Sequence, residues 1–318
     1  ETLSPTEHYA TTGIQVMEIN TLAQLLSIKG TAQLESAHRL LFMPDLFSYF
    51  LTGNATNEYC IASTSELLDA KKRDWSWETI EGLGLPKHIF GEIVMPGTVR
   101  GELRKDIAEE TGLGDVKVIA VGSHDTASAV AAVPAIEGDG PVAFLSSGTW
   151  SLLGLELPEP ILTEEARKAE FTNEGGVGGR IRFLQNITGL WIMQRLMAEW
   201  KERGEEQTFA QILPAAEQAN ISSIIPVADA AFMNPSSMEQ AICDYCKQSN
   251  QQVPQTKGEL VRTVLLSLAT KYREAINGIS GIMPEKPKRL HIIGGGSQTD
   301  LLNQFTADAL GIPVWAGP

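Results

Sequence analysis

The chain has 318 residues, of which 43% are hydrophobic and 20% charged, and its formal net charge at pH 7 is −14. This composition predicts a globular protein, and the length favours two domains because a single hydrophobic core seldom grows that large. The acidic balance disfavours nucleic acids and anionic membranes as partners, since both are bound by clustered Lys and Arg side chains.

The sequence predicts neither a disulfide framework nor a membrane anchor. The chain has three cysteines, an odd number that cannot all be paired in disulfides within the chain. This number is typical of a protein from a reducing compartment. Cys243 and Cys246 have C-x-x-C spacing, but without a second pair or a nearby His this spacing favours two positions one helical turn apart over a metal site. No apolar run approaches the ~20 residues of a transmembrane helix, and the first residues show no signal peptide. We therefore expect a cytoplasmic protein.

The first third of the chain alternates helix and strand signals. Helices are expected at residues 21–28, 44–52, 75–83 and 102–111. Pro44 is placed at the first position of the second helix and Gly53 just beyond its end, while Gly112 ends the fourth helix.

Residues 116–133 join a run rich in β-branched residues, 116–121, to an alanine-rich helix through the polar turn Ser123, His124, Asp125 and Thr126. Ligands of α/β sheets bind beyond the carboxyl ends of strands, where helix N-termini present free N–H groups, so Asp125 is the first candidate for chemistry. The alternative is a plain N-cap, a position that Asp often occupies. The capping box is incomplete, because residue 128 is Ser rather than Glu or Gln.

Residues 135–141, AIEGDGP, are rich in Gly and acidic residues and predict the boundary between a first domain, 1–137, and a second domain, 138–318. Two strand-like runs follow within residues 142–157, and the turn 146–149 between them predicts a β-hairpin. Its hydroxyls and backbone N–H groups favour an anion-binding concavity, with a plain surface hairpin as the alternative.

The second half continues with strands at 181–184, 289–293 and 312–315 and helices at about 188–203, 258–279 and 297–310. Gly294, Gly295 and Gly296 form a bare turn in which a flat ligand can lie close to the backbone. Taken alone, Asn186 is a polar residue before a helix and Gln194 a solvated helix position.

Several well-known motifs are absent from the sequence. It contains no P-loop and no complete G-x-G-x-x-G, which disfavours P-loop nucleotide binding and a Rossmann dehydrogenase. It also lacks H-E-x-x-H and G-x-S-x-G, so zinc hydrolysis and acyl transfer lack their usual residues.

Three segments, in this order and spacing, resemble the FGGY carbohydrate kinases of the actin-like ATPase superfold. They are PGTVRGELRKDIAEETGLGDVKVIAVGSHDTASA, LSSGTWS and IIGGGSQTDLLNQFTADALGIPV. The resemblance implies an α/β fold of two ribonuclease H-like domains with an interdomain cleft, the N-terminal domain being incomplete in this chain. Such enzymes phosphorylate sugars with ATP, and Mg²⁺ bridges the phosphate oxygens and is held mainly by ATP and waters.

Within this family, five segments are most similar to the enzymes of L-rhamnose catabolism that phosphorylate L-rhamnulose at O1. They are MPDLFSYFLTG, SHDTASAV, LSSGTWSLLG, TNEGGVGGR and NITGLWIMQR. The alternatives are an L-fuculose or xylulose kinase, a non-catalytic actin-like module that binds sugar or nucleotide, and an unrelated α/β enzyme.

The resemblance also implies roles for individual residues. Asp125 matches the general base that accepts the proton of the sugar hydroxyl. The positions that match sugar contacts are His124, Asp125, Thr126 and Asn186. The positions that match ATP contacts are Thr149, Gln194 and Gly295, and no residue matches a metal ligand.

The chain departs from the family pattern at both ends. The family begins with a β-hairpin carrying an acidic D-x-G-type loop that grips the phosphates, and no such motif occurs here. A first sugar-binding loop and a final Gly-Asn helix are also missing. We therefore expect the chain to be an internal portion of the enzyme, and residues 1–318 alone to be unable to catalyse transfer at a useful rate.

Overall fold

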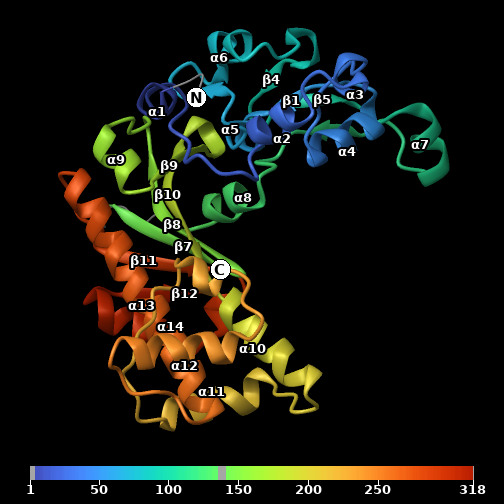
Figure 1. Ribbon diagram of the computed structural model, residues 1–318. Helices are drawn as coiled ribbons and strands as arrows, with labels where there is room; N and C mark the ends of the chain where they lie inside the picture. The colour runs from blue at the N-terminus through green and yellow to red at the C-terminus, as the bar shows by residue number, and fades with distance from the viewer. Residues whose placement is uncertain (1–3, 135–140, 318) are drawn as a thin grey trace. The chain divides into compact units, whose positions relative to one another are not determined.

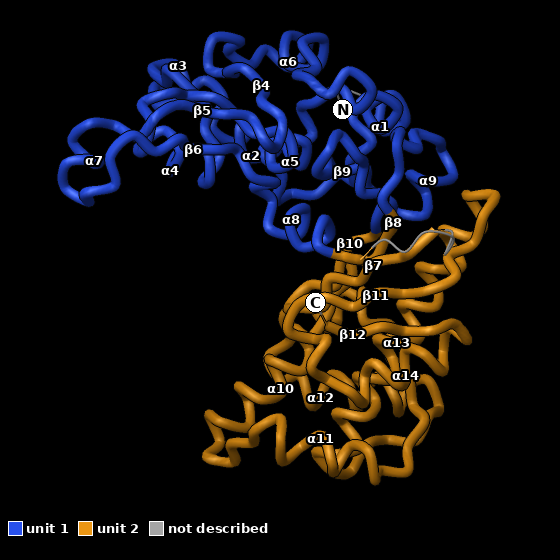
Figure 2. The backbone as a smooth tube through the Cα atoms, turned by 180° about the vertical axis from the view of Figure 1, so that it is seen from behind, with its two compact units in different colours: residues 1–132, 156–184 blue, residues 133–155, 185–318 orange. Residues whose placement is uncertain are grey.

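The structure is a computed structural model that describes residues 4–134 and 141–317 (Figure 1). It divides into two compact units, of which unit 1 comprises residues 1–132 and 156–184 and unit 2 comprises residues 133–155 and 185–318 (Figure 2). The return of residues 156–184 to unit 1 was not predicted. The predicted boundary at 135–141 lies outside the described residues except for residue 141, so a division between 137 and 138 stays a prediction.

Unit 1 contains nine short α-helices among its described residues. They are α1 (Pro5–Thr12), α2 (Thr21–Ser27), α3 (Ala32–Glu35), α4 (Met43–Thr52), α5 (Tyr59–Ser63), α6 (Trp77–Gly82), α7 (Lys105–Thr111), α8 (Asp125–Ala131) and α9 (Glu164–Lys168). Gly53 and Gly112 have left-handed backbone conformations, with φ of 79° and 70°, and end α4 and α7 as predicted. The helices expected at 75–83 and 102–111 begin later, because β3 (Asp74–Trp75) and β5 (Val99–Glu102) use their first residues.

The strands of unit 1 are short, and most of them form two-stranded sheets. β1 (Asn57–Glu58) runs parallel to β4 (Ile93–Val94), while β2 (Leu68–Asp69) runs antiparallel to β3. The core of this unit lies among α2, α5, α6 and these strands, and its largest buried side chains include Tyr59, Trp75 and Ile80. One-turn 3-10 helices, η1 (Lys87–Ile89) and η2 (Val177–Gly179), complete unit 1.

Strand β6 (Lys117–Ile119) is shorter than the strand expected at 116–121. It pairs antiparallel with β5 in a two-stranded sheet, and Val116, Ile119 and Val121 are 40–62% exposed. The turn that carries Asp125 therefore follows a two-stranded ribbon rather than a strand of a parallel sheet. A β-branched run favours an extended backbone whatever lies beside it, so the run alone could not reveal this pairing.

Unit 2 is built on β7 (Val142–Ser147), the first part of β8 (Trp150–Leu157), β11 (Arg289–Ile293) and β12 (Val314–Ala316). β7 and β8 form the predicted hairpin, and β11 runs parallel to both β7 and β12. Strand β10 (Ile181–Thr188) follows β8 in the strand order, and its first half pairs antiparallel with β9 (Thr172–Gly175) of unit 1.

The described helices of unit 2 lie below its strands in the view of Figure 1. They are α10 (Trp191–Glu202), α11 (Phe209–Gln218), α12 (Met238–Gln248), α13 (Lys257–Ile282) and α14 (Asp300–Leu310), with 3-10 turns η3 (Ala230–Phe232) and η4 (Gly295–Gln298). A capping box of Thr256 and Glu259 begins α13, which packs against α11 and α14. The apolar face expected on α13 is confirmed, because the side chains at positions 260, 264, 268, 272 and 276 are all buried.

Two predicted helix starts in unit 2 were wrong. The helix expected from residue 188 begins at Trp191, because β10 continues to Thr188, and Asn186 consequently lies inside a strand. The helix expected from residue 297 begins at Asp300, after η4. Cys243 and Cys246 are one turn apart on α12, as expected from their spacing.

Candidate active site

The carboxyl ends of β7 and β11 form one edge of the sheet in unit 2. The two strands are parallel and in register, with Ser146 opposite Ile293. The hairpin turn at 148–149 follows β7, and the triple-glycine turn follows β11. Because ligands of α/β sheets bind beyond the carboxyl ends of parallel strands, this edge is a candidate nucleotide site.

The three glycines of this turn have different surroundings. Gly294 has a φ of 83°, and a Cβ there would lie 2.8 Å from the Ser147 carbonyl oxygen. A Cβ at Gly296 would lie 2.0 Å from Ser147 Oγ, whereas a Cβ at Gly295 would have no atom within 4 Å. The outer glycines therefore allow the turn to pack on β7, and the central glycine leaves an open backbone surface against which a flat ligand can lie.

Thr149 and Gln194 lie in contact beside this edge. Both residues are exposed, and the Thr149 hydroxyl oxygen is 3.2 Å from the Gln194 side-chain amide. The carbonyl oxygen of Gly148 accepts from the N–H of Leu190 at 2.9 Å, and that of Thr149 accepts from Gly189 at 3.1 Å. The hairpin tip is thereby attached to the start of α10, which brings these two predicted ATP contacts together.

Two of the groups expected to form an anion-binding concavity at 146–149 do not face solvent freely in the structure. The Ser147 side chain is buried, and the Gly148 N–H donates to the Trp150 carbonyl oxygen at 2.8 Å. Tight pairing at the hairpin tip thus uses groups that were expected to face an anion. The exposed Thr149 hydroxyl remains available to a phosphate oxygen.

Asp125 is the first residue of α8 in unit 1, and its side chain is fully exposed. Its Oδ1 accepts from the Thr126 N–H at 2.6 Å. The N-cap is His124, whose side chain makes no capping bond, so the interpretation of Asp125 as the N-cap was wrong. An open carboxylate in the first turn of a helix can accept a hydrogen bond from a hydroxyl that binds within reach of it.

His124 and Thr126 flank this carboxylate in unit 1, whereas Asn186, the fourth predicted sugar contact, lies in the part of β10 that belongs to unit 2. The His124 side chain is 21% exposed, and its Nδ1 is buried without a hydrogen-bond partner. Burial lowers the pKa of His124 below its ordinary value, and the Glu174 carboxylate opposes this effect. The neutral imidazole is therefore favoured in the folded protein.

This shift predicts a pH-dependent stability. The unfolded chain binds a proton at His124 as the pH falls through about 6.5, while the folded chain resists protonation to lower pH. We expect the stabilisation from neutral His124 to be complete above that pH and to be lost below it. Thermal melting of wild type and His124→Gln between pH 8 and pH 5 tests this, because the wild type should lose more stability on acidification. Parallel curves would contradict it.

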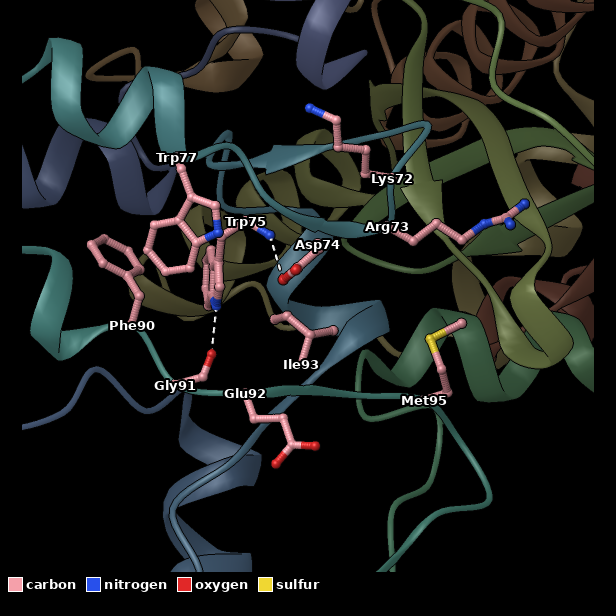
Figure 3. Close-up of a pocket in the computed structure, with 10 residues that line it drawn as sticks. All are labelled: Lys72, Arg73, Asp74, Trp75, Trp77, Phe90, Gly91, Glu92, Ile93 and Met95. Atoms are coloured by element: carbon pink, nitrogen blue, oxygen red, sulfur yellow. Dashed lines mark hydrogen bonds between the residues drawn. The ribbon is translucent and has the colours of Figure 1, made fainter.

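Sequence reasoning missed Glu58, whose buried carboxylate accepts from Ser123 in the turn before Asp125. The only local signal was an acidic residue directly before a short helix. A cavity of about 520 Å³ in unit 1 was also not predicted (Figure 3). Trp75, Trp77 and Phe90 line it, and the Trp75 indole N–H donates to the Gly91 carbonyl oxygen at 2.6 Å. It contains none of the predicted site residues.

Neither a protein metal site nor a transmembrane helix is found in the described structure. Among residues 4–134 and 141–317, no group of three or more His, Cys, Asp or Glu side chains is arranged to hold a metal ion. Within the same ranges, every helix is too short or too polar to cross a bilayer.

Comparison with known protein families matches both parts of the chain. Residues 1–132 match the model for the N-terminal domain of the FGGY family of carbohydrate kinases, and residues 143–317 match that for its C-terminal domain. The chain belongs to the FGGY family of carbohydrate kinases. The family predicted from the sequence motifs is thereby confirmed.

Two similar FGGY relatives are named rhamnulokinase. The chain is 45% identical to the protein from Bacteroides thetaiotaomicron over 99% of its own length and 64% of that relative. It is 40% identical to the protein from Oceanobacillus iheyensis over 97% of its own length and 65% of that relative. The chain thus spans less than two thirds of the length of these relatives.

Two solved kinase structures share the fold. Gluconate kinase from Lactobacillus acidophilus aligns with a TM-score of 0.75 at 18% identity, covering 98% of this chain and 62% of that one. Glycerol kinase from Plasmodium falciparum aligns with a TM-score of 0.74 at 11% identity and the same coverage. The expected two-domain α/β sugar kinase fold is confirmed.

Proposed function

We propose that the intact protein is an ATP-dependent kinase that converts L-rhamnulose to L-rhamnulose 1-phosphate in L-rhamnose catabolism. The structural observation that carries the proposal is the fully exposed Asp125 carboxylate at the start of α8. The 45% identity to a rhamnulokinase across nearly the whole chain supports L-rhamnulose as the sugar.

Asp125 is the proposed general base. Its carboxylate accepts the proton of the primary hydroxyl at C1 as that oxygen attacks the γ-phosphorus of ATP. The new O–P bond forms while the bond from the γ-phosphorus to the bridging oxygen breaks, and ADP leaves with the electron pair. His124, Thr126 and Asn186 are the proposed sugar contacts. A loose transition state gains most from positioning and charge stabilisation, so one carboxylate suffices as base.

The edge of the sheet in unit 2 is the proposed ATP site. The open backbone at Gly295 is assigned to adenosine, with Gln194 as a further nucleotide contact, and the exposed Thr149 hydroxyl is assigned to the phosphates. Mg²⁺ enters as MgATP, with phosphate oxygens and waters as its main ligands.

The two neighbouring glycines provide a matched test of this assignment. We expect Gly295→Ala to leave the melting temperature nearly unchanged, because its Cβ meets no atom, but to raise the KM for ATP several-fold. Gly296→Ala should destabilise the protein by about 1–3 kcal/mol, because its Cβ overlaps Ser147. Thermal melting and steady-state kinetics of both variants separate these effects. An unchanged KM for ATP in Gly295→Ala would remove this glycine from the nucleotide site.

Product identification tests the proposed reaction itself. The intact protein is incubated with MgATP and, separately, L-rhamnulose, L-fuculose and D-xylulose, and ADP and sugar phosphates are measured by mass spectrometry and ³¹P NMR. We expect the highest kcat/KM for L-rhamnulose, with phosphate on O1. Preference for another ketose would correct the substrate, and absence of ketose-dependent ADP formation would overturn the kinase assignment.

A further inference from the structure

One buried carboxylate joins two segments of unit 1 that are distant in the sequence. Glu58 is completely buried, and its Oε2 accepts from Ser123 Oγ at 2.6 Å and from the Ser123 N–H at 3.0 Å. The same carboxylate caps α5, since it accepts from the N–H groups of Cys60 at 2.8 Å and Ile61 at 3.2 Å. Hydrogen bonds to a charged acceptor are about twice as strong as neutral ones, so Ser123 is firmly held.

The position of Ser123 matters because His124 and Asp125 follow it directly. The Asp125 side chain is fully exposed, so the location of its carboxylate is set by the backbone that carries it. Besides Glu58, the turn is held by Ser128, whose hydroxyl donates to the Gly122 carbonyl oxygen at 2.6 Å. The bonds from Glu58 are therefore a principal attachment of the Asp125 turn to the core of its unit.

Glu58 is itself held by a buried polar network. Its backbone N–H donates to Asp45 Oδ1 at 3.1 Å, and Asn57 Nδ2 donates to Asp45 Oδ2 at 3.3 Å. Asp45 in turn forms an ion pair with Arg100 at 2.8 Å, with both side chains buried. Because both the backbone and the side chain of Glu58 are hydrogen-bonded, Glu58 holds Ser123 in a narrower range of positions than a mobile surface residue would.

We propose that Glu58 is a positioning residue for phosphoryl transfer, which acts through Ser123 to hold the Asp125 carboxylate at the bound hydroxyl. This inference rests on the proposed function, and no contact between Glu58 and the substrate is required. Small misplacements of a catalytic group lower turnover strongly because productive geometry is narrow. Loss of the Glu58–Ser123 bonds should therefore reduce kcat while leaving ATP binding intact.

The test uses Ser123→Ala and Glu58→Gln in the intact protein, with Ser65→Ala as a matched control. Ser65 is a completely buried serine of the same unit whose hydroxyl also donates at 2.6 Å, but to the Ala62 carbonyl oxygen. We expect kcat to fall ~10-fold or more in Ser123→Ala and Glu58→Gln with an unchanged KM for ATP, and to stay within about twofold of wild type in the control. Equal kcat in Ser123→Ala and Ser65→Ala would overturn the proposal.

Combination with Asp125→Asn separates positioning from a general loss of structure. If Ser123 acts only through Asp125, Ser123→Ala should cause no further decrease of kcat in the Asp125→Asn background, whereas independent effects would multiply and refute the proposal. Amide hydrogen exchange supplies a readout without catalysis. Exchange at residues 124–127 should accelerate in Ser123→Ala and not in Ser65→Ala, and equal exchange would also refute it. Absence of sugar phosphorylation by the wild type would instead reject the proposed function.

Discussion

Asp125→Asn should lower kcat of the intact enzyme ~10²-fold or more while leaving its affinity for ATP nearly unchanged. The amide cannot accept the proton of the sugar hydroxyl. Because the Asp125 side chain is fully exposed, the substitution disturbs little packing. Steady-state kinetics with L-rhamnulose and MgATP, together with a thermal melting curve, measure both expectations.

Asp115→Asn is a suitable control for this experiment. Asp115 is an exposed aspartate of the same unit, ten residues before the proposed base. Its substitution by Asn removes the same negative charge at a position outside the Asp125 turn. Its kcat should match that of the wild type. Equal turnover of Asp125→Asn and Asp115→Asn would remove the general-base role from Asp125.

The largest expected effect on stability comes from Arg100→Met, which we expect to lower the free energy of unfolding by about 3–5 kcal/mol. The Arg100 guanidinium lies 2.8 Å from Asp45, is also bonded to Ser48 and Thr56, and is buried with the carboxylate. Methionine fills part of the volume but leaves the Asp45 charge buried without its cation. Urea denaturation followed by circular dichroism measures the loss.

Two comparisons isolate the ion pair. Arg104→Met should cost at most about 1 kcal/mol, because the Arg104–Asp106 pair is exposed to solvent. Burial raises the pKa of Asp45 while Arg100 opposes that shift, so removing Arg100 should raise this pKa further. The penalty of Arg100→Met should therefore be smaller at pH 5 than at pH 8, because protonation of Asp45 relieves it. A loss that is similar to that of Arg104→Met and independent of pH would contradict this account.

Local sequence signals predicted several elements of the fold correctly. Gly53 and Gly112 ended their helices because a left-handed cap is encoded by the residue itself. The strand, glycine turn and helix at 289–310 were also found, since both apolar periodicity and glycine are local properties. The site residues came from family resemblance, and their assigned roles remain predictions.

Features that depend on pairing between distant segments were not predictable in this way. Strand β6 pairs with β5, and strand β10 continues past Asn186 to Thr188. The residues of β6 and β10 themselves do not indicate which strand lies beside them. The capping box alone could not show that His124, rather than Asp125, is the N-cap. Glu58 gave no distinctive signal, because its contact to Ser123 joins residues separated by 65 positions.

The triple-glycine turn would affect the outcome of random mutagenesis. Side chains at 294 and 296 collide with Ser147, so clones altered there would be depleted through misfolding before any selection for activity acts on them. Clones altered at 295 would survive as folded protein, and under the proposed assignment of Gly295 to the ATP site they would differ chiefly in their KM for ATP. The three glycines would thus be retained for two different reasons: folding at positions 294 and 296, and nucleotide binding at the proposed site for position 295.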